Sequence, residues 1–269
     1  MKDGKPCVVT GGGRTAPAGV LMAAMLVVML VVMLSVTAVL WAAPVRAAEP
    51  GAPRGDESSI TLREDDFDID VRYPRLGQAA VDDDLARWAA HIVAAFRQGL
   101  VEPGTGGEPV NGTPDLNAHH FVNELKVTYD VTRASARAAT VTFSIWTYTG
   151  GAHGNLDIIT LSYDMASGAR LAPEDIFADT EVALTLLASY CYDALAETLG
   201  DDRAEDMLRS GTSPDADNYA SLALTPEGVR VHFPPYQVAP WSSGPQQVDV
   251  PLGVLIDAGP RLELWGVTR

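Results

Sequence analysis

Apolar and polar residues alternate with a period of two along several short stretches of this 269-residue chain. Such alternation places apolar side chains on one face of a strand and polar side chains on the other. A hairpin is also predicted where residues 219–224 and 229–233 flank the turn Thr225-Pro226-Glu227-Gly228. The remaining predicted strands cover residues 67–73, 125–131, 141–145, 159–163 and 248–250.

Apolar residues spaced three and four apart indicate two main helices. The first follows three acidic residues, Asp82 to Asp84, which can cap a helix and favour its positive end. The second is predicted from Thr180 to Leu199, with Asp179 as its cap. Shorter helices are expected over residues 201–209 and 251–256. The apolar face of the first helix comprises Leu85, Trp88, Ala89, Ile92, Val93 and Phe96.

The strands come in neighbouring runs, and the helices do not alternate with them one for one. This order argues against a sheet built from repeated βαβ units. The expected fold class is α+β, with an antiparallel β-sheet and two main helices packed on one face, after an N-terminal signal or anchor helix. Residues 102–118 hold several Gly and Pro residues and are predicted to form a surface loop.

Residues 1–47 have the pattern of an export signal. Basic residues within the first fourteen positions precede a stretch from Ala16 to Pro44 that has no charged residue, and small residues up to Ala47 are typical of a cleavage site. The apolar run exceeds the roughly 20 residues that span a bilayer, so an uncleaved membrane anchor stays open as an alternative. Both alternatives predict that the rest of the chain lies in the periplasm or elsewhere outside the cytoplasm.

The exported part is expected to be a flexible lead-in over residues 48–58 and one domain over residues 59–269. Its charge is strongly acidic. The whole chain has a net charge of −16, and a cut after Ala47 removes four bases and one acid, which makes it −19. Such a charge repels nucleic acid and anionic lipid, and it attracts a basic partner. The inner membrane is an expected partner only if the N-terminal segment stays uncleaved.

Cys191 is the only cysteine of the exported part, so no internal disulfide can form there. It lies in an apolar helical stretch and is expected to be a small buried hydrophobe.

Two stretches join glycine or proline turns to aromatic residues inside this β-rich pattern. In the first, Gly150, Gly151 and Gly154 permit the backbone to take positive φ and bring the turn close to a neighbour. In the second, several prolines keep the chain stiff and so lower the ordering cost of binding. The stretches are Tyr148-Thr149-Gly150-Gly151-Ala152-His153-Gly154-Asn155 and Phe233-Pro234-Pro235-Tyr236-Gln237-Val238-Ala239-Pro240-Trp241-Ser242-Ser243-Gly244.

The first stretch resembles the Tyr-x-Gly-Gly-Ala-His-Gly turn of the RsiV/PdaC-like extracytoplasmic domain family. Three later stretches, residues 167–177, 222–228 and 233–252, fit the pattern of that family in the same order. The resemblance covers residues 67–256. It implies a protein related to lysozyme-sensing anti-sigma factors and to the accessory domains of peptidoglycan deacetylases.

Two features of the chain limit what this resemblance implies. About a dozen residues precede the apolar segment, too few to fold a sigma-factor-binding element, so signalling is not expected. No two His residues have the i, i+4 spacing of a helical metal site, and the sequence ends after the shared region, so deacetylase activity is not carried over. What remains is a non-catalytic recognition module at the cell wall.

Seven residues are candidates for ligand binding. The His153 imidazole can bind an acid, a sugar hydroxyl or a metal, or it can lock the turn by bonding to a carbonyl. Tyr236 and Trp241 suit a sugar face or a protein hot spot, or they can cover the end of the core. Trp146 shares the sheet face of Tyr148 and lines a second face or meets a helix. The seven candidates are Tyr148, Gly150, Gly151, His153, Asn155, Tyr236 and Trp241.

No cofactor, metal or catalytic residue is predicted. Adjacent residues on a strand point to opposite faces, so His119 and His120 cannot readily hold one ion. No Gly-x-Ser-x-Gly elbow is present, and carboxylates such as Asp82 to Asp84 are expected to be solvated caps rather than acid/base pairs.

The leading hypothesis is therefore a non-catalytic cell-envelope module that binds a wall hydrolase of the lysozyme type or peptidoglycan. One alternative is an enzyme acting on wall glycan, with His153 and Tyr236 in one pocket. A passive envelope scaffold without a ligand is the other. Whether the two stretches meet at an open groove separates the first two hypotheses from the third.

Overall fold

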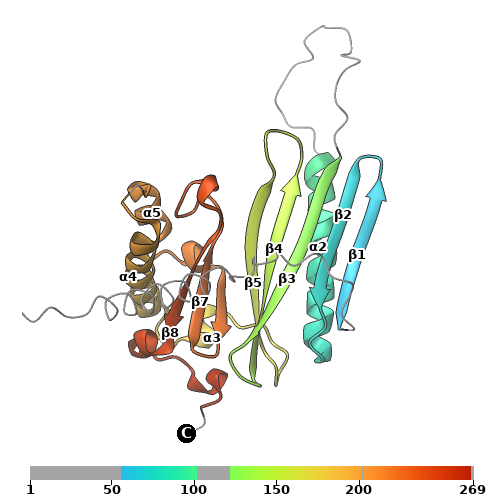
Figure 1. Cartoon of the computed structure of the whole chain (residues 1–269). Coiled ribbons are helices and arrows are strands. Elements are labelled where there is room, and N and C mark those ends of the chain that lie inside the picture. The colour runs from blue at the N-terminus through green and yellow to red at the C-terminus, as the bar shows by residue number, and fades with distance from the viewer. Residues whose placement is uncertain (1–55, 102–121, 202, 268–269) are drawn as a thin grey trace, which may run out of the picture. The chain divides into compact units, whose positions relative to one another are not determined.

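Two β-sheets, each packed against one long helix, make up the fold in the computed structural model, which describes residues 56–101, 122–201 and 203–267 (Figure 1). The predicted signal or anchor, most of the lead-in, the 102–118 loop and the His119–His120 pair lie outside these residues. Within them, no helix has both the length and the apolar character needed to cross a bilayer.

The first sheet has five strands in the order β1-β2-β3-β4-β5, and the second has three in the order β6-β7-β8. The strands are β1 (Glu57–Glu64), β2 (Phe67–Pro74), β3 (Asn123–Arg133), β4 (Ala138–Tyr148), β5 (Asn155–Asp164), β6 (Leu222–Thr225), β7 (Gly228–Phe233) and β8 (Gln246–Pro251). The α-helices are α2 (Ala79–Val101), α3 (Pro173–Ile176), α4 (Thr180–Leu199) and α5 (Glu205–Gly211). The 3₁₀-helices are η1 (Ala216–Tyr219), η2 (Trp241–Ser243), η3 (Leu252–Ala258) and η4 (Leu262–Trp265).

The α+β class is confirmed, and so are the strands predicted for β2 to β5, the β6–β7 hairpin and β8. Helix α4 has the predicted bounds, and the Asp179 carboxylate accepts a hydrogen bond from the Val182 amide at 3.0 Å. The strand β1 was not predicted. Its first two residues fall within the expected flexible lead-in, yet β1 pairs along its whole length with β2.

The arrangement of the sheets differs from the single antiparallel sheet that the pattern favoured. Strands β2 and β3 are parallel, with Ile69 opposite Leu125, while the other pairs of described strands are antiparallel. Helix α2 lies between β2 and β3 in the chain, and such a crossover lets the second strand run in the same direction as the first. The two long helices also cover different sheets (Figure 1).

The first core lies between α2 and one face of the five-stranded sheet. Alternate residues of β2, β3 and β4 are fully or nearly fully buried there, and the Trp88 ring stacks on Phe143 at 3.9 Å. Helix α2 begins at Ala79, so Asp82 to Asp84 lie inside its first turns and do not precede it. The Gln78 side chain instead accepts a hydrogen bond from the Val81 amide at 3.0 Å, as an N-cap residue does.

Asp84 is not a solvated residue, contrary to the prediction from its position among three acids. Its side chain is 19% exposed. Oδ2 accepts hydrogen bonds from the Tyr163 hydroxyl at 2.9 Å and from Arg170, which ties α2 to β5 and to the segment after it. Burial would raise the pKa of the Asp84 carboxyl, but the hydrogen bonds from Arg170 and Tyr163 outweigh burial and hold that pKa below its ordinary value.

The second core lies between α4 and the three-stranded sheet. Ala183, Leu187, Cys191 and Leu195 recur every fourth residue on α4 and are buried against apolar residues of β7 and β8. Burial raises the pKa of the Cys191 thiol to about 12, which keeps it protonated and confirms the predicted buried hydrophobe.

The shorter helices are shifted from their predicted positions. Helix α5 begins at Glu205 rather than at residue 201, and its Leu208 is fully buried, so it is not a purely polar helix. Tyr219, expected at the start of a strand, ends the 3₁₀-helix η1 instead. The short helix predicted over residues 251–256 is present as η3.

Hydroxyl groups join the two sheets. Strand β6 forms the edge of the small sheet, so one row of its backbone groups is not used by β7. The Leu224 amide donates to Thr140 Oγ1 at 3.0 Å, and the Leu224 carbonyl accepts from Thr132 Oγ1 at 3.0 Å. The Leu222 carbonyl accepts from Thr160 Oγ1, also at 3.0 Å. The polar face of the large sheet thus completes the hydrogen bonding of the edge strand.

We expect Thr140→Val to lower the free energy of unfolding by about 1–3 kcal/mol, because it leaves the buried Leu224 amide without an acceptor. Thr140 is fully buried, and its hydroxyl also bonds to Ser162 Oγ at 2.8 Å. Urea denaturation measures the change. The matched control is Thr142→Val on the same strand and face, whose hydroxyl forms no hydrogen bond with the described residues. Equal losses in the two variants would contradict this account.

We expect Asp84→Asn to lower the free energy of unfolding at pH 7 by about 1–2 kcal/mol. The substitution removes the negative charge of the carboxylate to which Arg170 and Tyr163 donate hydrogen bonds. The pKa of Asp84 is lower in the folded protein, so its contribution is present above the carboxyl's ordinary pKa and is lost as the pH falls through the lowered value. The difference between wild type and variant should therefore shrink in acid. The control is Asp83→Asn at the exposed position next to Asp84. It should change the free energy of unfolding little, both at pH 7 and in acid.

Candidate functional site

The two stretches singled out in the sequence meet in the fold and form an aromatic cluster. We define the aromatic cluster as Trp146, His153, Tyr236 and Trp241. The His153 ring stacks on Trp241 with centroids 4.7 Å apart and an interplanar angle of 20°. The Trp241 ring also lies 5.8 Å from Tyr236 and 6.3 Å from Trp146. Trp241 therefore contacts three rings, one from β4, one from the turn after β4 and one from its own segment.

The turn between β4 and β5 presents His153 at the surface. Gly150 and Gly151 have φ of 93° and 102°, which confirms the predicted positive φ at both positions. The Tyr148 hydroxyl donates a hydrogen bond to the Gly151 carbonyl at 3.2 Å. His153 Nδ1 lies 2.7 Å from the Gly154 carbonyl. In a neutral ring this contact requires the proton on Nδ1, and Nε2 is then free to accept a hydrogen bond from a ligand.

Gly154 is needed for a different reason from the two glycines before it, because it permits close approach rather than positive φ. A Cβ at this position would lie 2.7 Å from the Thr147 carbonyl and inside contact distance of the Trp146 ring. The indole of Trp146 therefore packs directly on the backbone of Gly154. This contact joins the turn to the strand face on which Trp146 lies.

The segment between β7 and η2 holds Tyr236 in a backbone conformation that is uncommon for a residue with a side chain. Its φ is 71°, and it is the one non-glycine residue with positive φ in the described part of the chain. The Tyr236 amide donates to the Ala239 carbonyl at 3.0 Å, and Val238 and Ala239 are buried. The Tyr236 side chain itself is 52% exposed. The buried residues anchor the segment while the tyrosine points outward.

A hydrogen bond from the Gln237 side chain joins this segment to the end of α5. The side-chain amide donates to the Gly211 carbonyl at 3.1 Å and to the Asn218 carbonyl at 3.0 Å. A Cβ at Gly211 would overlap the backbone of Gln237, so the glycine is needed for this approach. The position of the aromatic segment therefore depends on the position of α5.

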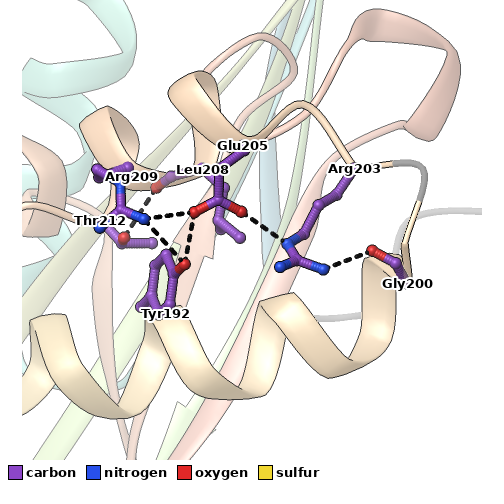
Figure 2. Close-up of polar contacts among 7 residues, drawn as sticks. All are labelled: Tyr192, Gly200, Arg203, Glu205, Leu208, Arg209 and Thr212. Atoms are coloured by element: carbon purple, nitrogen blue, oxygen red, sulfur yellow. Dashed lines mark hydrogen bonds and ion pairs between the residues drawn. The ribbon is translucent and has the colours of Figure 1, made fainter.

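A charged network holds α5 on α4 (Figure 2). Glu205 accepts hydrogen bonds from the Tyr192 hydroxyl at 2.6 Å, from Arg209 at 2.6 Å and from Arg203 at 2.9 Å. Arg203 also donates to the Gly200 carbonyl at the end of α4. The hydrogen bond from Tyr192 is the main cause that lowers the pKa of Glu205 below its ordinary value. The hydrogen bond from Arg203 and the positive charges of Arg203 and Arg209 lower it further. Glu205 stays ionised at neutral pH and keeps both arginines in place.

The structure brings most of the predicted candidates together, but not all of them. His153, Tyr236 and Trp241 join through their rings, and Tyr148, Gly150 and Gly151 shape the turn. Asn155 is exposed and donates to the Asp157 carboxylate at 3.0 Å, outside the ring contacts. Trp146 was missing from the predicted candidates. Trp146 occupies a position of β4 that the alternation assigns to the polar face, and a large aromatic residue at such a position was the signal in the sequence.

Polar side chains lie next to the aromatic cluster on the large sheet. Lys126 is opposite Trp146 in the β3–β4 register, and it pairs with Glu124 at 2.9 Å. The aromatic cluster offers ring faces and an imidazole, and charged side chains lie beside it. This arrangement suits sugar rings with hydroxyl groups. His153 and Tyr236 both contact Trp241, whereas the enzyme hypothesis requires them in one pocket. Neither lines either of the two cavities that the structure describes, of about 430 and 270 Å³.

Comparison with known proteins relates this chain to a family without an assigned function. Residues 174–253 match the model described as "Protein of unknown function (DUF3298)". The chain is also similar to the peptidoglycan-N-acetylmuramic acid deacetylase PdaC of Bacillus subtilis strain 168. The two are 27% identical over 193 residues, which are 71% of this chain and 38% of PdaC. The chain thus spans well under half the length of this relative, and the resemblance is to a PdaC-like DUF3298 protein.

Two crystal structures share the fold. A DUF3298 family member from Bacteroides fragilis NCTC 9343 matches with a TM-score of 0.53 and 18% identity, over 78% of this chain and 95% of that one. A DUF3298 family protein from Pseudomonas aeruginosa PAO1 matches with a TM-score of 0.50 and 18% identity, over 74% and 89%. At this identity the likeness concerns the fold alone.

We expect Gly154→Ala to displace the Trp146 ring and to lower stability by about 1–3 kcal/mol, because the added methyl group overlaps that ring and the Thr147 carbonyl. Near-ultraviolet circular dichroism should lose the signal of the packed tryptophans. Gly253→Ala is the matched control, since a Cβ there meets nothing within 4 Å. An unchanged spectrum for Gly154→Ala would show that Trp146 does not depend on this contact.

Proposed function

We propose that this chain is a non-catalytic binding module of the cell envelope that recognises the glycan of peptidoglycan through the aromatic cluster. One observation carries the proposal. Rings from two stretches far apart in the sequence stack at the surface, with His153 on Trp241 at 4.7 Å and Tyr236 beside them. The predicted export signal places the domain where such a polymer occurs, and the relative PdaC is named for its action on peptidoglycan.

The geometry of the cluster favours a sugar as its ligand. An aromatic ring offers a broad apolar face to the C–H groups of a pyranose, and its polar neighbours offer hydrogen bonds to the hydroxyls. The rings are already held in place, by Gly154 behind Trp146 and by Gln237 beside Tyr236. Binding then costs little side-chain entropy, which favours affinity for a neutral polymer.

The acidic charge supports a second candidate, a basic wall hydrolase of the lysozyme type. A net charge of −16 over the whole chain attracts a basic protein over a long range. Such an attraction weakens as salt is added, because the Debye length falls from about 10 Å at 0.1 M to about 3 Å at 1 M. Stacking of rings on a neutral sugar has no such dependence, so salt distinguishes the two candidates.

We expect the purified chain to sediment with insoluble peptidoglycan and Trp241→Ala to bind at least about ten-fold more weakly, as a truncated hot spot does. Binding should change little between about 0.1 M and about 1 M NaCl, because stacking on a neutral sugar is not weakened by the screening of charge. Ile256→Ala is the matched control, because Ile256 is 54% exposed and lies on η3 outside the aromatic cluster. Melting temperatures confirm that both variants fold.

Three outcomes would contradict the proposal of a non-catalytic glycan-binding module. Sedimentation of Trp241→Ala that equals that of the wild type would exclude the aromatic cluster as the site. Binding to lysozyme that is lost at high salt, with no sedimentation on peptidoglycan, would favour the hydrolase instead. Release of a product from the polymer that stops in His153→Ala would favour the enzyme hypothesis.

A further inference from the structure

A cavity of about 430 Å³ lies between the two cores, and none of the proposed glycan-binding residues lines it. Residues of β5 and β6 line it from the sheets, and residues of α3, α4 and η1 line it from the helices. Its volume falls in the range of about 300–1,000 Å³ that is typical of small-molecule sites. The sequence did not indicate it, because its walls come from five separate elements.

The walls of the cavity are apolar. Five of the lining side chains are buried hydrophobic residues: Ile176, Phe177, Ala183, Leu187 and Tyr219. Three of the four hydroxyl groups that line it are already engaged, since Thr160 donates to the Leu222 carbonyl and Ser162 bonds to Thr140. The Tyr219 hydroxyl likewise donates to the Thr212 carbonyl at 2.8 Å. The interior therefore suits an apolar group better than a polar one.

The lining also includes two exposed carboxylates, which contrast with these walls. Glu174 of α3 and Asp217 of η1 are exposed lining residues, and neither carboxylate forms an ion pair with a described residue. Arg261 bonds to the backbone carbonyl of Glu174 and pairs with the neighbouring Asp175, so it does not neutralise the Glu174 carboxylate. Negative charge next to an apolar hollow attracts a cation that carries an apolar tail.

We propose that this cavity binds a small amphipathic amine, with its apolar tail between α4 and β5 and its ammonium group at Glu174 and Asp217. Transfer of the apolar tail from water to the apolar walls is the main driving force for binding. The two carboxylates select the charge of the head group, and an anionic head on the same tail is repelled. This site is separate from the aromatic cluster and does not depend on the proposed glycan binding.

Isothermal titration calorimetry with three probes of equal chain length tests the proposal: n-octylamine, 1-octanol and octanoate, each below the concentration at which it aggregates. At pH 7 the amine should bind at least about ten-fold more tightly than the alcohol, corresponding to one favourable charge contact. Octanoate should bind most weakly. Trp241→Ala should bind n-octylamine as the wild type does, which separates this site from the glycan site.

Variants that fill the cavity test its location. Ala183→Phe places a ring in the hollow from a buried position of α4, and Leu184→Phe does so from a partly exposed position that is less sensitive to overpacking. Both should abolish binding of all three probes. Leu186→Phe on the same helix is the control, because Leu186 does not line the cavity.

The double variant Glu174→Gln, Asp217→Asn tests the head group. It should reduce n-octylamine binding to the level of 1-octanol and leave 1-octanol binding unchanged. Octanoate binding as tight as that of the amine would overturn the proposal, and so would undiminished amine binding in a correctly folded Leu184→Phe variant.

Discussion

Hydroxyl groups on the polar face of the large sheet are the constraint on which the rest of the structure depends. An edge strand such as β6 has backbone groups that must find partners when the strand is buried. Thr132, Thr140 and Thr160 supply those partners, and no strand of the large sheet pairs with β6. The two sheets are therefore fixed to one another by side chains, and each keeps its own apolar core on the side away from this contact.

That contact determines where the two candidate sites lie. The turn after β4 belongs to the large sheet, and the segment after β7 belongs to the small one, so the aromatic cluster exists only because the sheets are held together. The apolar cavity lies along the same boundary, between β5 and the helices of the second core. Glu205, through α5 and Gln237, keeps the small-sheet side of the cluster in place. Both candidate sites thus lie along the boundary between the two sheets, and not within either core.

The elements with strong local signals were predictable from the sequence. Helix α4 has a regular apolar spacing and a carboxylate cap at Asp179, and both act within a few residues of the chain. The strands β3 to β5 alternate because one face packs into the apolar core while the other carries polar side chains. Strand β1 was missed because it is an edge strand with mostly polar residues and is stabilised by β2. The start of α2 was misplaced because Gln78, and not the acidic run, accepts the capping hydrogen bond.

The sequence by itself determined the α+β class, most of the strands, helix α4, the buried Cys191 and the glycine-dependent turn at residues 150–151, since each follows from local spacing or from backbone sterics. Only the tertiary structure decided the parallel pairing of β2 with β3, the separation into two sheets and the stacking of His153 on Trp241. The same holds for the environment of Asp84, which local sequence presents as a solvated acid. These features join residues far apart in the chain, and hydrophobic periodicity carries no information on which distant segments become neighbours.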